Sequence, residues 1–219
     1  CGSDLHMWHG NVPVRQTPIV LGHEIAGVIV ECGAETAPWR PGARVIVRAA
    51  GGCGACARCR TGEDNLCPNQ TVLGMDTDGG FAQYVLTPAA NLIRLPSEIP
   101  FETGAILTDA VATPYHAVTN RGQMRRGESV VILGCGGLGT HAIQIARLLG
   151  AGFVIAVDVR SAALDRARRL GADAAIDSRE EAAYKAVQRL TEGGADLVLD
   201  FVGRPETASQ ALRCLRPGG

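Results

Sequence analysis

A strand that runs directly into a glycine-rich turn and then a helix constrains the fold of this chain more than any other feature. The apolar residues 130–133 predict a buried strand, and the six residues that follow have the spacing G-x-G-x-x-G. Further strand-like and helical stretches alternate as far as residue 201. Because strands that alternate with helices pair in parallel, the second half of the chain is predicted to be a doubly wound α/β sheet.

The glycine-rich turn predicts a site for a dinucleotide cofactor, because glycines here permit a tight turn and let backbone N–H groups approach a pyrophosphate. Asp158 ends the next predicted strand, 158 − 139 = 19 positions after the last glycine. A carboxylate there accepts hydrogen bonds from an adenosine ribose and repels a 2′-phosphate, so NAD is expected rather than NADP, although Arg160 can partly offset the repulsion. The expected cofactor-binding residues are Gly134, Gly136, Gly137, Leu138, Gly139, Asp158 and Arg160.

Four cysteines predict a structural zinc site. Cys53, Cys56, Cys59 and Cys67 follow the spacing C-x-x-C-x-x-C-x7-C, which lets four thiolates surround one Zn²⁺ tetrahedrally. A disulfide framework is the alternative, but it is typical of small cysteine-dense proteins rather than of a chain of 219 residues with 46% hydrophobic residues. An iron–sulfur cluster also uses four thiolates; its usual bacterial run is tighter, but Pro68 after the last cysteine keeps this alternative open.

The first half of the chain shows short β-like runs separated by Gly/Pro turns. Residues 25–31, 44–48 and 81–87 are predicted strands, and helical spacing runs from residue 103 to residue 121. We therefore expect two domains, a β-rich domain at 1–112 and a dinucleotide-binding domain at 113–219. The chain begins without a methionine and ends on an Arg-Pro-Gly-Gly turn, so we expect it to be a fragment in which both domains are incomplete.

Charge and hydropathy restrict the expected partners. A net charge of −1 gives no electrostatic reason to expect nucleic acid or an anionic membrane as a partner. No stretch reaches the roughly 20 apolar residues of a membrane span, and no charged-then-apolar leader opens the sequence. We expect a cytoplasmic protein that binds a small molecule, since thiolate zinc ligands persist most easily where thiols stay reduced.

Two more motifs lie near the start of the chain, Cys1-Gly2-Ser3-Asp4-Leu5-His6 and Gly22-His23-Glu24-Ile25-Ala26-Gly27. Together with the cysteine series and the glycine-rich turn, in this order, they make the whole chain resemble the zinc-dependent alcohol dehydrogenases of the medium-chain dehydrogenase/reductase superfamily. The resemblance implies a β-rich GroES-like catalytic domain followed by a Rossmann-type doubly wound parallel sheet. It also implies one catalytic and one structural zinc ion, NAD as cofactor, and a homo-oligomer for the full-length protein.

The resemblance assigns the catalytic zinc to residues that are scattered in the sequence. Cys1, His23 and Asp109 are its implied protein ligands; many relatives have cysteine in place of Asp109 and some have aspartate. The fourth position is left for the oxygen of an alcohol, whose pKa the ion lowers so that hydride can pass to the nicotinamide. Thr113, four residues after Asp109, matches a position beside the nicotinamide ring or satisfies a helix carbonyl.

Further roles are implied for residues close to these ligands. Ser3 and His6 would relay the released proton to water, although Ser3 could instead cap a helix. Asp4 would hold the ring of His23 in the tautomer that presents a lone pair to zinc. Glu24 would assist ligand exchange at the metal, and a solvated charge is the alternative for both acids.

The preferred function is a reversible oxidoreductase that transfers a hydride between an alcohol and NAD, giving an aldehyde or ketone. A polyol or sugar dehydrogenase with the same zinc is one alternative, and a non-catalytic NAD-binding relative is another. The zinc content distinguishes an enzyme from a non-catalytic relative, because a structural relative is expected to bind about one zinc per chain and an enzyme about two.

Overall fold

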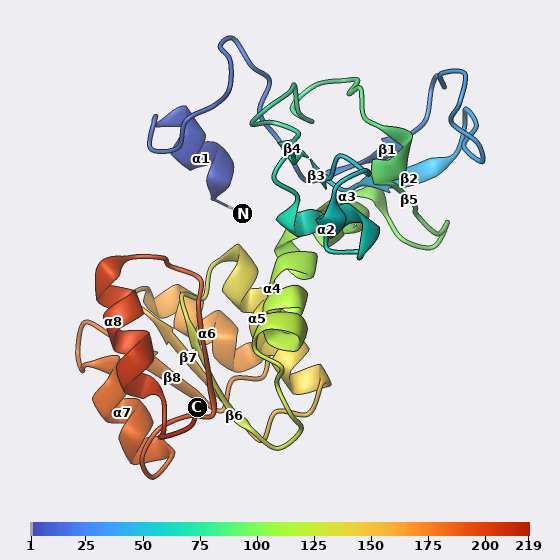
Figure 1. The fold of residues 1–219 in the computed structure, drawn as a ribbon. Helices are drawn as coiled ribbons and strands as arrows, with labels where there is room; N and C mark the ends of the chain where they lie inside the picture. The colour runs from blue at the N-terminus through green and yellow to red at the C-terminus, as the bar shows by residue number, and fades with distance from the viewer. Residues whose placement is uncertain (1) are drawn as a thin grey trace. The chain divides into compact units, whose positions relative to one another are not determined.

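The computed structural model describes residues 2–219, which form two compact units, one ending at Asp109 and the other spanning Ala110–Gly219 (Figure 1). The first unit is rich in short strands and loops, and the second alternates strands with helices around a parallel sheet. The predicted α/β fold class is therefore confirmed. None of the helices in this part of the chain has the length and apolar character needed to cross a membrane.

The first unit is built on a three-stranded antiparallel sheet with the order β1-β2-β5. The central strand β2 pairs on both edges, and three of its four residues are buried. A helix, α3, lies close to this sheet because Gly104 has no side chain; a Cβ there would come within 2.9 Å of Leu95 and 3.0 Å of Ile46. The elements are α1 Ser3–Trp8, β1 Ile25–Val28, β2 Arg44–Val47, β5 Leu92–Arg94 and α3 Phe101–Ile106.

A second group of short elements surrounds the cysteine series. The two-stranded antiparallel pair β3 (Ala50–Gly51) and β4 (Thr71–Val72) encloses it in the sequence. Between these strands lie the one-turn helix α2 (Ala57–Arg60) and the 3₁₀ turn η1 (Asp64–Leu66), and the 3₁₀ turn η2 (Ala89–Asn91) follows later in the chain.

The strand predicted at residues 81–87 is wrong. This segment has no regular structure, and within the described residues its backbone joins no sheet. Its largest apolar side chains are exposed, with Phe81 and Tyr84 each 72% and Leu86 93% accessible. The alternating apolar pattern indicates a chain suited to a sheet, but a strand forms only where a neighbouring strand accepts its hydrogen bonds.

The helical spacing predicted for residues 103–121 is confirmed and begins slightly earlier. After α3 the chain forms a π-helical turn η3 (Leu107–Val111), the helix α4 (Ala112–His116) and a second π-helical turn η4 (Ala117–Arg121). Asp109 lies within the first of these wider turns. Single π turns inside helices change the direction of side chains and occur frequently at functional sites.

The second unit is a four-stranded parallel sheet with the order β8-β7-β6-β9. Alternate residues of its central strands face opposite sides, so that Val130 and Ile132 belong to one buried cluster and Val131 and Leu133 to the other. Helices α5 and α6 cover the first cluster, and α7 and α8 cover the second. The elements are β6 Ser129–Leu133, α5 Gly137–Leu148, β7 Phe153–Asp158, α6 Ser161–Arg169, β8 Ala174–Asp177, α7 Ala183–Leu190, β9 Leu197–Asp200 and α8 Pro205–Cys214.

The strand order of this sheet reverses at β6. From β6 the chain proceeds to β7 and β8 on one side and then returns to β9 on the other. Open parallel sheets bind ligands at the carboxyl ends of the strands where the order reverses. The glycine-rich turn leaves the carboxyl end of β6, so it lies at this point of reversal.

Candidate metal centres and dinucleotide loop

Four sulfur atoms converge in the loop between β3 and β4. The Sγ atoms of Cys53, Cys56, Cys59 and Cys67 all lie within 4.8 Å of one another. The Cys56 Sγ is 3.5 Å from the Cys59 Sγ and 3.7 Å from the Cys67 Sγ, and all four residues are free thiols. A tetrahedral zinc ion with Zn–S bonds of about 2.3 Å separates its sulfurs by about 3.8 Å, so the group fits one ion and is too widely spaced for disulfides.

Short-range features of the loop bring these sulfurs together. The helix α2 begins directly after Cys56, and Cys67 follows the turn η1. Gly52 is required for the close approach, because a Cβ on it would lie 2.7 Å from the Cys59 sulfur. An ion pair of 2.6 Å between Arg48 and Asp64 joins the loop to the end of β2.

The thiols of this group do not have equal acidity. Backbone N–H groups of Ala55 and Cys56 lower the pKa of Cys53 to about 6, so its thiolate forms near neutral pH. Desolvation and the neighbouring thiol of Cys56 instead raise the pKa of Cys59 to about 12. Four thiolates this close would repel one another, and a cation among them would remove the repulsion.

A buried histidine lies between two carboxylates in the first unit. His23 Nδ1 is 3.2 Å from an Asp4 carboxylate oxygen, and His23 Nε2 is 3.3 Å from Asp109 Oδ2. The side chains of His23, Asp4 and Asp109 are 10%, 19% and 18% exposed, so all three are shielded from solvent. Asp4 lies in the first turn of α1, His23 in the loop before β1, and Asp109 in the π-helical turn η3.

This arrangement suits either a protonated imidazole or a metal ion. The hydrogen bond to Asp109 raises the pKa of His23, burial lowers it, and the charge of Asp4 raises it again, with a net increase. Two zinc ligands with bonds of 2.0–2.1 Å at a tetrahedral angle lie about 3.3 Å apart. The separation of His23 Nε2 and Asp109 Oδ2 matches this value, so these residues fit a zinc ion.

Glycines fix the loop that carries His23. Gly22 has φ +101°, a conformation that residues other than glycine rarely adopt, and a Cβ on it would lie 2.8 Å from Phe81. Its backbone N–H donates a 3.0 Å hydrogen bond to Asp4 Oδ1. Asp4 is therefore held by the loop and by the histidine ring together, and it can select the tautomer that leaves the Nε2 lone pair on the side of Asp109.

The glycine-rich turn leaves the start of α5 accessible. Gly134 has φ +86°, and a Cβ on Gly139 would lie 1.9 Å from the Gly134 carbonyl oxygen. By contrast, a Cβ on Gly136 or Gly137 would meet no atom within 4 Å. No side chain caps α5 at Gly136, so the turn presents backbone N–H groups at a helix N-terminus to an open space that a pyrophosphate can occupy.

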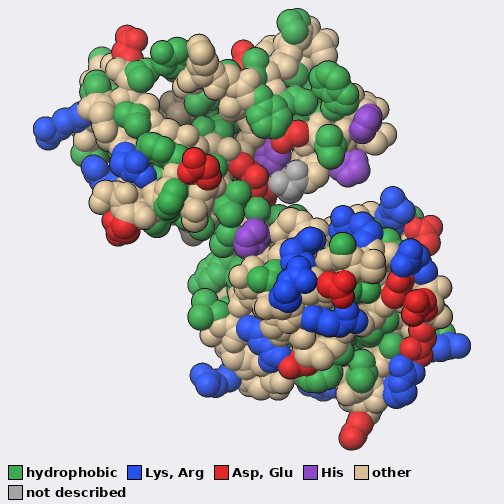
Figure 2. Space-filling model, turned by 180° about the vertical axis from the view of Figure 1, so that it is seen from behind, with side chains coloured by type: hydrophobic (Ala, Val, Ile, Leu, Met, Phe, Trp, Pro, Cys, Tyr) green, Lys and Arg blue, Asp and Glu red, His purple; other side chains and the backbone are tan. Residues whose placement is uncertain are grey.

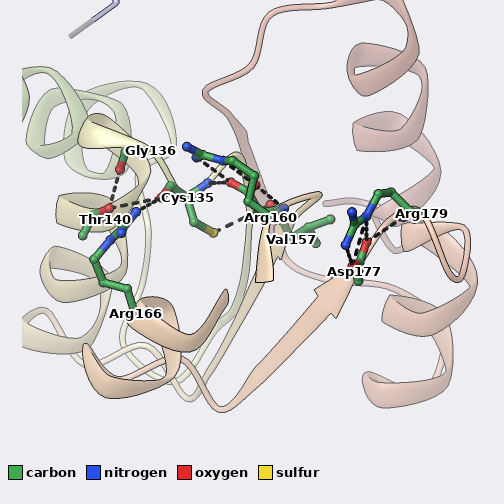
Figure 3. A network of polar contacts seen from close by, with 9 residues as sticks. Cys135, Gly136, Thr140, Val157, Arg160, Arg166, Asp177 and Arg179 are labelled. Atoms are coloured by element: carbon green, nitrogen blue, oxygen red, sulfur yellow. Dashed lines mark hydrogen bonds and ion pairs between the residues drawn. The ribbon is translucent and has the colours of Figure 1, made fainter. Parts of the chain in front are cut away.

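Asp158 is buried and has several hydrogen-bond partners, among them Cys135 and Arg160, whose side chains Figure 3 shows. Its Oδ2 accepts a 2.8 Å hydrogen bond from the Cys135 N–H, and its Oδ1 accepts bonds of 2.9 and 3.1 Å from the backbone and Nε of Arg160. Burial raises the pKa of Asp158, but the bonds from Arg160 and Cys135 outweigh it and lower the pKa overall. The carboxylate is charged and already paired with Arg160, which the spacing in the sequence did not reveal.

Comparisons with known proteins agree with both units. Residues 1–97 match the model of the alcohol dehydrogenase GroES-like domain, and residues 137–219 match that of the zinc-binding dehydrogenases. The chain belongs to the family of zinc-binding dehydrogenases in the medium-chain dehydrogenase/reductase superfamily. The family predicted from the four motifs is therefore confirmed.

Individual relatives of this chain differ in their named activities. It is 35% identical to L-threonine 3-dehydrogenase of Bacillus licheniformis and 36% identical to sorbitol dehydrogenase of Halalkalibacterium halodurans, and in each case all of the chain aligns with 64% of the relative. It also superposes on an alcohol dehydrogenase from Thermus sp. ATN1, with a TM-score of 0.93, 36% identity, and coverage of 100% of this chain and 65% of that one. The chain thus spans about 64% of the length of the curated relatives it matches.

A second solved structure bears on the cofactor. It is described as a zinc-binding dehydrogenase from Sinorhizobium meliloti 1021 bound to NADP, and it matches with a TM-score of 0.91 and 35% identity over 100% of this chain and 64% of that one. Dehydrogenases of this family thus include a protein that holds the phosphorylated dinucleotide.

The remaining predicted site residues of the chain lie in separate places. Cys1 is outside the described residues. Ser3 is the first residue of α1 and follows the N-cap residue Gly2. His6 is exposed in the last turn of α1, and Glu24 lines a cavity of about 500 Å³ in the first unit.

Thr113 belongs to α4 and is exposed in the second unit. The assigned roles of Ser3, His6, Glu24 and Thr113 remain predictions. Gly52 and Arg166, by contrast, have structural roles that no motif indicated. The adjacent glycines before Cys53 are the sequence signal that could have indicated the role of Gly52. The sequence holds no such signal for Arg166, because its partner is 31 residues away.

Proposed function

We propose that the protein is a zinc-dependent oxidoreductase that transfers a hydride between an alcohol and NAD, giving an aldehyde or ketone reversibly. The observation that carries this proposal is the position of His23, held by Asp4 on one ring nitrogen and facing Asp109 at 3.3 Å with the other. Such a carboxylate–histidine pair, completed by a ligand-competent carboxylate, is the donor set of a zinc site.

His23 and Asp109, with Cys1, would hold the catalytic zinc, and the cysteine group would hold the structural one. The catalytic ion, when bound, acts as a Lewis acid that lowers the pKa of an alcohol. Asp4 keeps the His23 ring oriented, and Ser3 and His6 pass the alcohol proton toward solvent. The exposed N–H groups at the start of α5 bind the cofactor pyrophosphate, and Asp158 accepts hydrogen bonds from the adenosine ribose.

A substrate screen with the full-length protein tests this function. Primary and secondary alcohols, sorbitol and L-threonine are offered with NAD, NADH formation is followed by absorbance, and zinc is counted by mass spectrometry. We expect turnover with at least one alcohol and about two zinc ions per chain. One zinc per chain without turnover of any substrate would instead identify a non-catalytic relative, and preference for sorbitol would favour a polyol dehydrogenase.

Asp4→Asn is expected to lower kcat/KM about 10- to 100-fold, which is the usual effect of removing a carboxylate behind a metal-binding histidine. Asparagine keeps the oxygen that accepts the Gly22 N–H, so the loop is preserved while the charge facing His23 is lost. Steady-state kinetics and competition with a zinc chelator measure the effect. Unchanged kinetics and zinc retention would exclude an orienting role for Asp4.

Asp158→Ser is expected to raise the ratio of kcat/KM for NADP to that for NAD by about tenfold, since it removes a negative charge near the 2′-phosphate and releases Arg160. Absolute binding of both cofactors is expected to fall, because the Cys135 N–H loses its acceptor. Asp177→Ser is the matched control, as Asp177 pairs with Arg179 in the same way at the end of β8. An unchanged cofactor ratio would show that Asp158 does not face the ribose.

A further inference from the structure

Most positive charges of the second unit are solvated. Lys and Arg side chains gather on the surface of this unit (Figure 2), and Arg168, for example, is exposed and pairs with Asp165 on the same helix. Arg166 differs from these, because it is partly buried and its guanidinium reaches the glycine-rich turn. This contact with the glycine-rich turn distinguishes Arg166 from the solvated arginines of the unit.

The peptide groups on both sides of Cys135 are held by side chains of opposite charge (Figure 3). Asp158, at the end of β7, accepts the Cys135 N–H at 2.8 Å. Arg166, in the last turn of α6, donates from its terminal nitrogen to the Cys135 carbonyl oxygen at 3.0 Å. The Thr140 hydroxyl of α5 lies 3.3 Å from the same oxygen, and the Cys135 side chain is buried.

We propose that Arg166 is a positioning residue for cofactor binding, which acts by fixing the orientation of the peptide between Cys135 and Gly136. This peptide is trans, so its C=O and N–H point in opposite directions. Holding the Cys135 carbonyl on the side of α6 therefore turns the Gly136 N–H away from α6. The inference rests on the proposed dinucleotide function, because this N–H is one of the groups offered to the pyrophosphate.

The composition of the turn makes such a restraint necessary. Four of its six residues, at positions 134 to 139, are glycines, which lose more conformational freedom on ordering than any other residue. The side of Gly136 that a Cβ would occupy is open space, so no packing there restrains the backbone. The hydrogen bond that Asp158 accepts from the Cys135 N–H and the one that Arg166 donates to the Cys135 carbonyl restrain it before the cofactor arrives, and a loop ordered in advance binds more tightly.

Arg166→Met tests the proposal, because methionine keeps much of the apolar stem and removes every donor. In the full-length protein we expect the dissociation constants of NADH and NADPH, measured by fluorescence titration, to rise together by roughly tenfold, the scale of a lost hydrogen bond from a charged group. The two cofactors share the pyrophosphate, so their ratio stays constant, unlike the result expected for Asp158→Ser. Hydrogen–deuterium exchange at residues 134–139 is expected to accelerate in the cofactor-free variant, with the unfolding temperature nearly unchanged.

Two further variants complete the test. Arg166→Lys keeps a charged donor and is expected to recover part of the affinity, and Arg169→Met, an exposed arginine of the same helix, is expected to change neither affinity nor exchange. Wild-type affinity or wild-type exchange in Arg166→Met would overturn the proposal, as would an equal loss in Arg169→Met or unequal effects on the two cofactors. If the unaltered protein binds neither dinucleotide, both the proposed function and the positioning role of Arg166 fail. If the unaltered protein binds the dinucleotides and Arg166→Met binds them equally well, the positioning role alone fails.

Discussion

Asp109→Ala is expected to abolish alcohol oxidation and to leave the zinc of the cysteine group in place. Asp109 Oδ2 faces His23 Nε2 at 3.3 Å, and its removal would leave the proposed catalytic zinc with two protein ligands. A metal ion acting as Lewis acid contributes several kcal/mol to the transition state, so we expect kcat/KM to fall by about 10³-fold or more. Steady-state kinetics and zinc analysis of the same preparation measure both effects, and the zinc content is expected to fall from about two to about one per chain.

Two variants separate ligand loss from general damage at Asp109. Asp109→Cys replaces the carboxylate with a thiolate, which also suits zinc, and is expected to retain measurable activity. Glu102→Ala removes an exposed acid from the neighbouring helix α3 and is expected to retain full activity. An active Asp109→Ala protein with two zinc ions would show that another residue completes the site.

Cys59→Ser is expected to remove about one zinc per chain and to lower the unfolding temperature by about 10 °C or more. A structural zinc contributes its binding free energy to folding, and weakening a four-thiolate site costs several kcal/mol, at about 2–4 °C per kcal/mol for a protein of this size or larger. Calorimetry and zinc analysis of the full-length protein provide the measurement. Because four protein ligands leave no open coordination position, substrate specificity is expected to stay the same.

Cys32→Ser is the matched control, because this free cysteine lies outside the four-sulfur group, and it is expected to retain both zinc ions. Gly52→Ala tests the packing around the group, since its new Cβ would lie 2.7 Å from the Cys59 sulfur and should also reduce zinc retention. If Cys59→Ser kept its full zinc content and stability, the cysteine group would not be a metal site.

Features that depend on neighbouring residues were predictable from the sequence. The cysteine series spans 15 residues, and its spacing alone indicated that four sulfurs converge, as they do within 4.8 Å. The turn at Gly134 and the start of α5 followed from one strand, six residues and one helix. The alternation of strands and helices indicated the parallel sheet because such connections restrict the topology.

Contacts between distant residues were decided only by the tertiary structure. His23 and Asp109 are 86 residues apart, and no spacing rule joins them; only the resemblance to a family suggested the pair. The bond from Arg166 to the Cys135 carbonyl spans 31 residues and has no motif at all. Residues 81–87 have the pattern of a strand but join no sheet, because a strand needs hydrogen-bonding partners from elsewhere in the chain. Local sequence patterns thus specified the turns, the cysteine group and the class of sheet. The packing of remote segments specified which polar groups meet, because the interaction energies of those groups depend on distances that local spacing does not set.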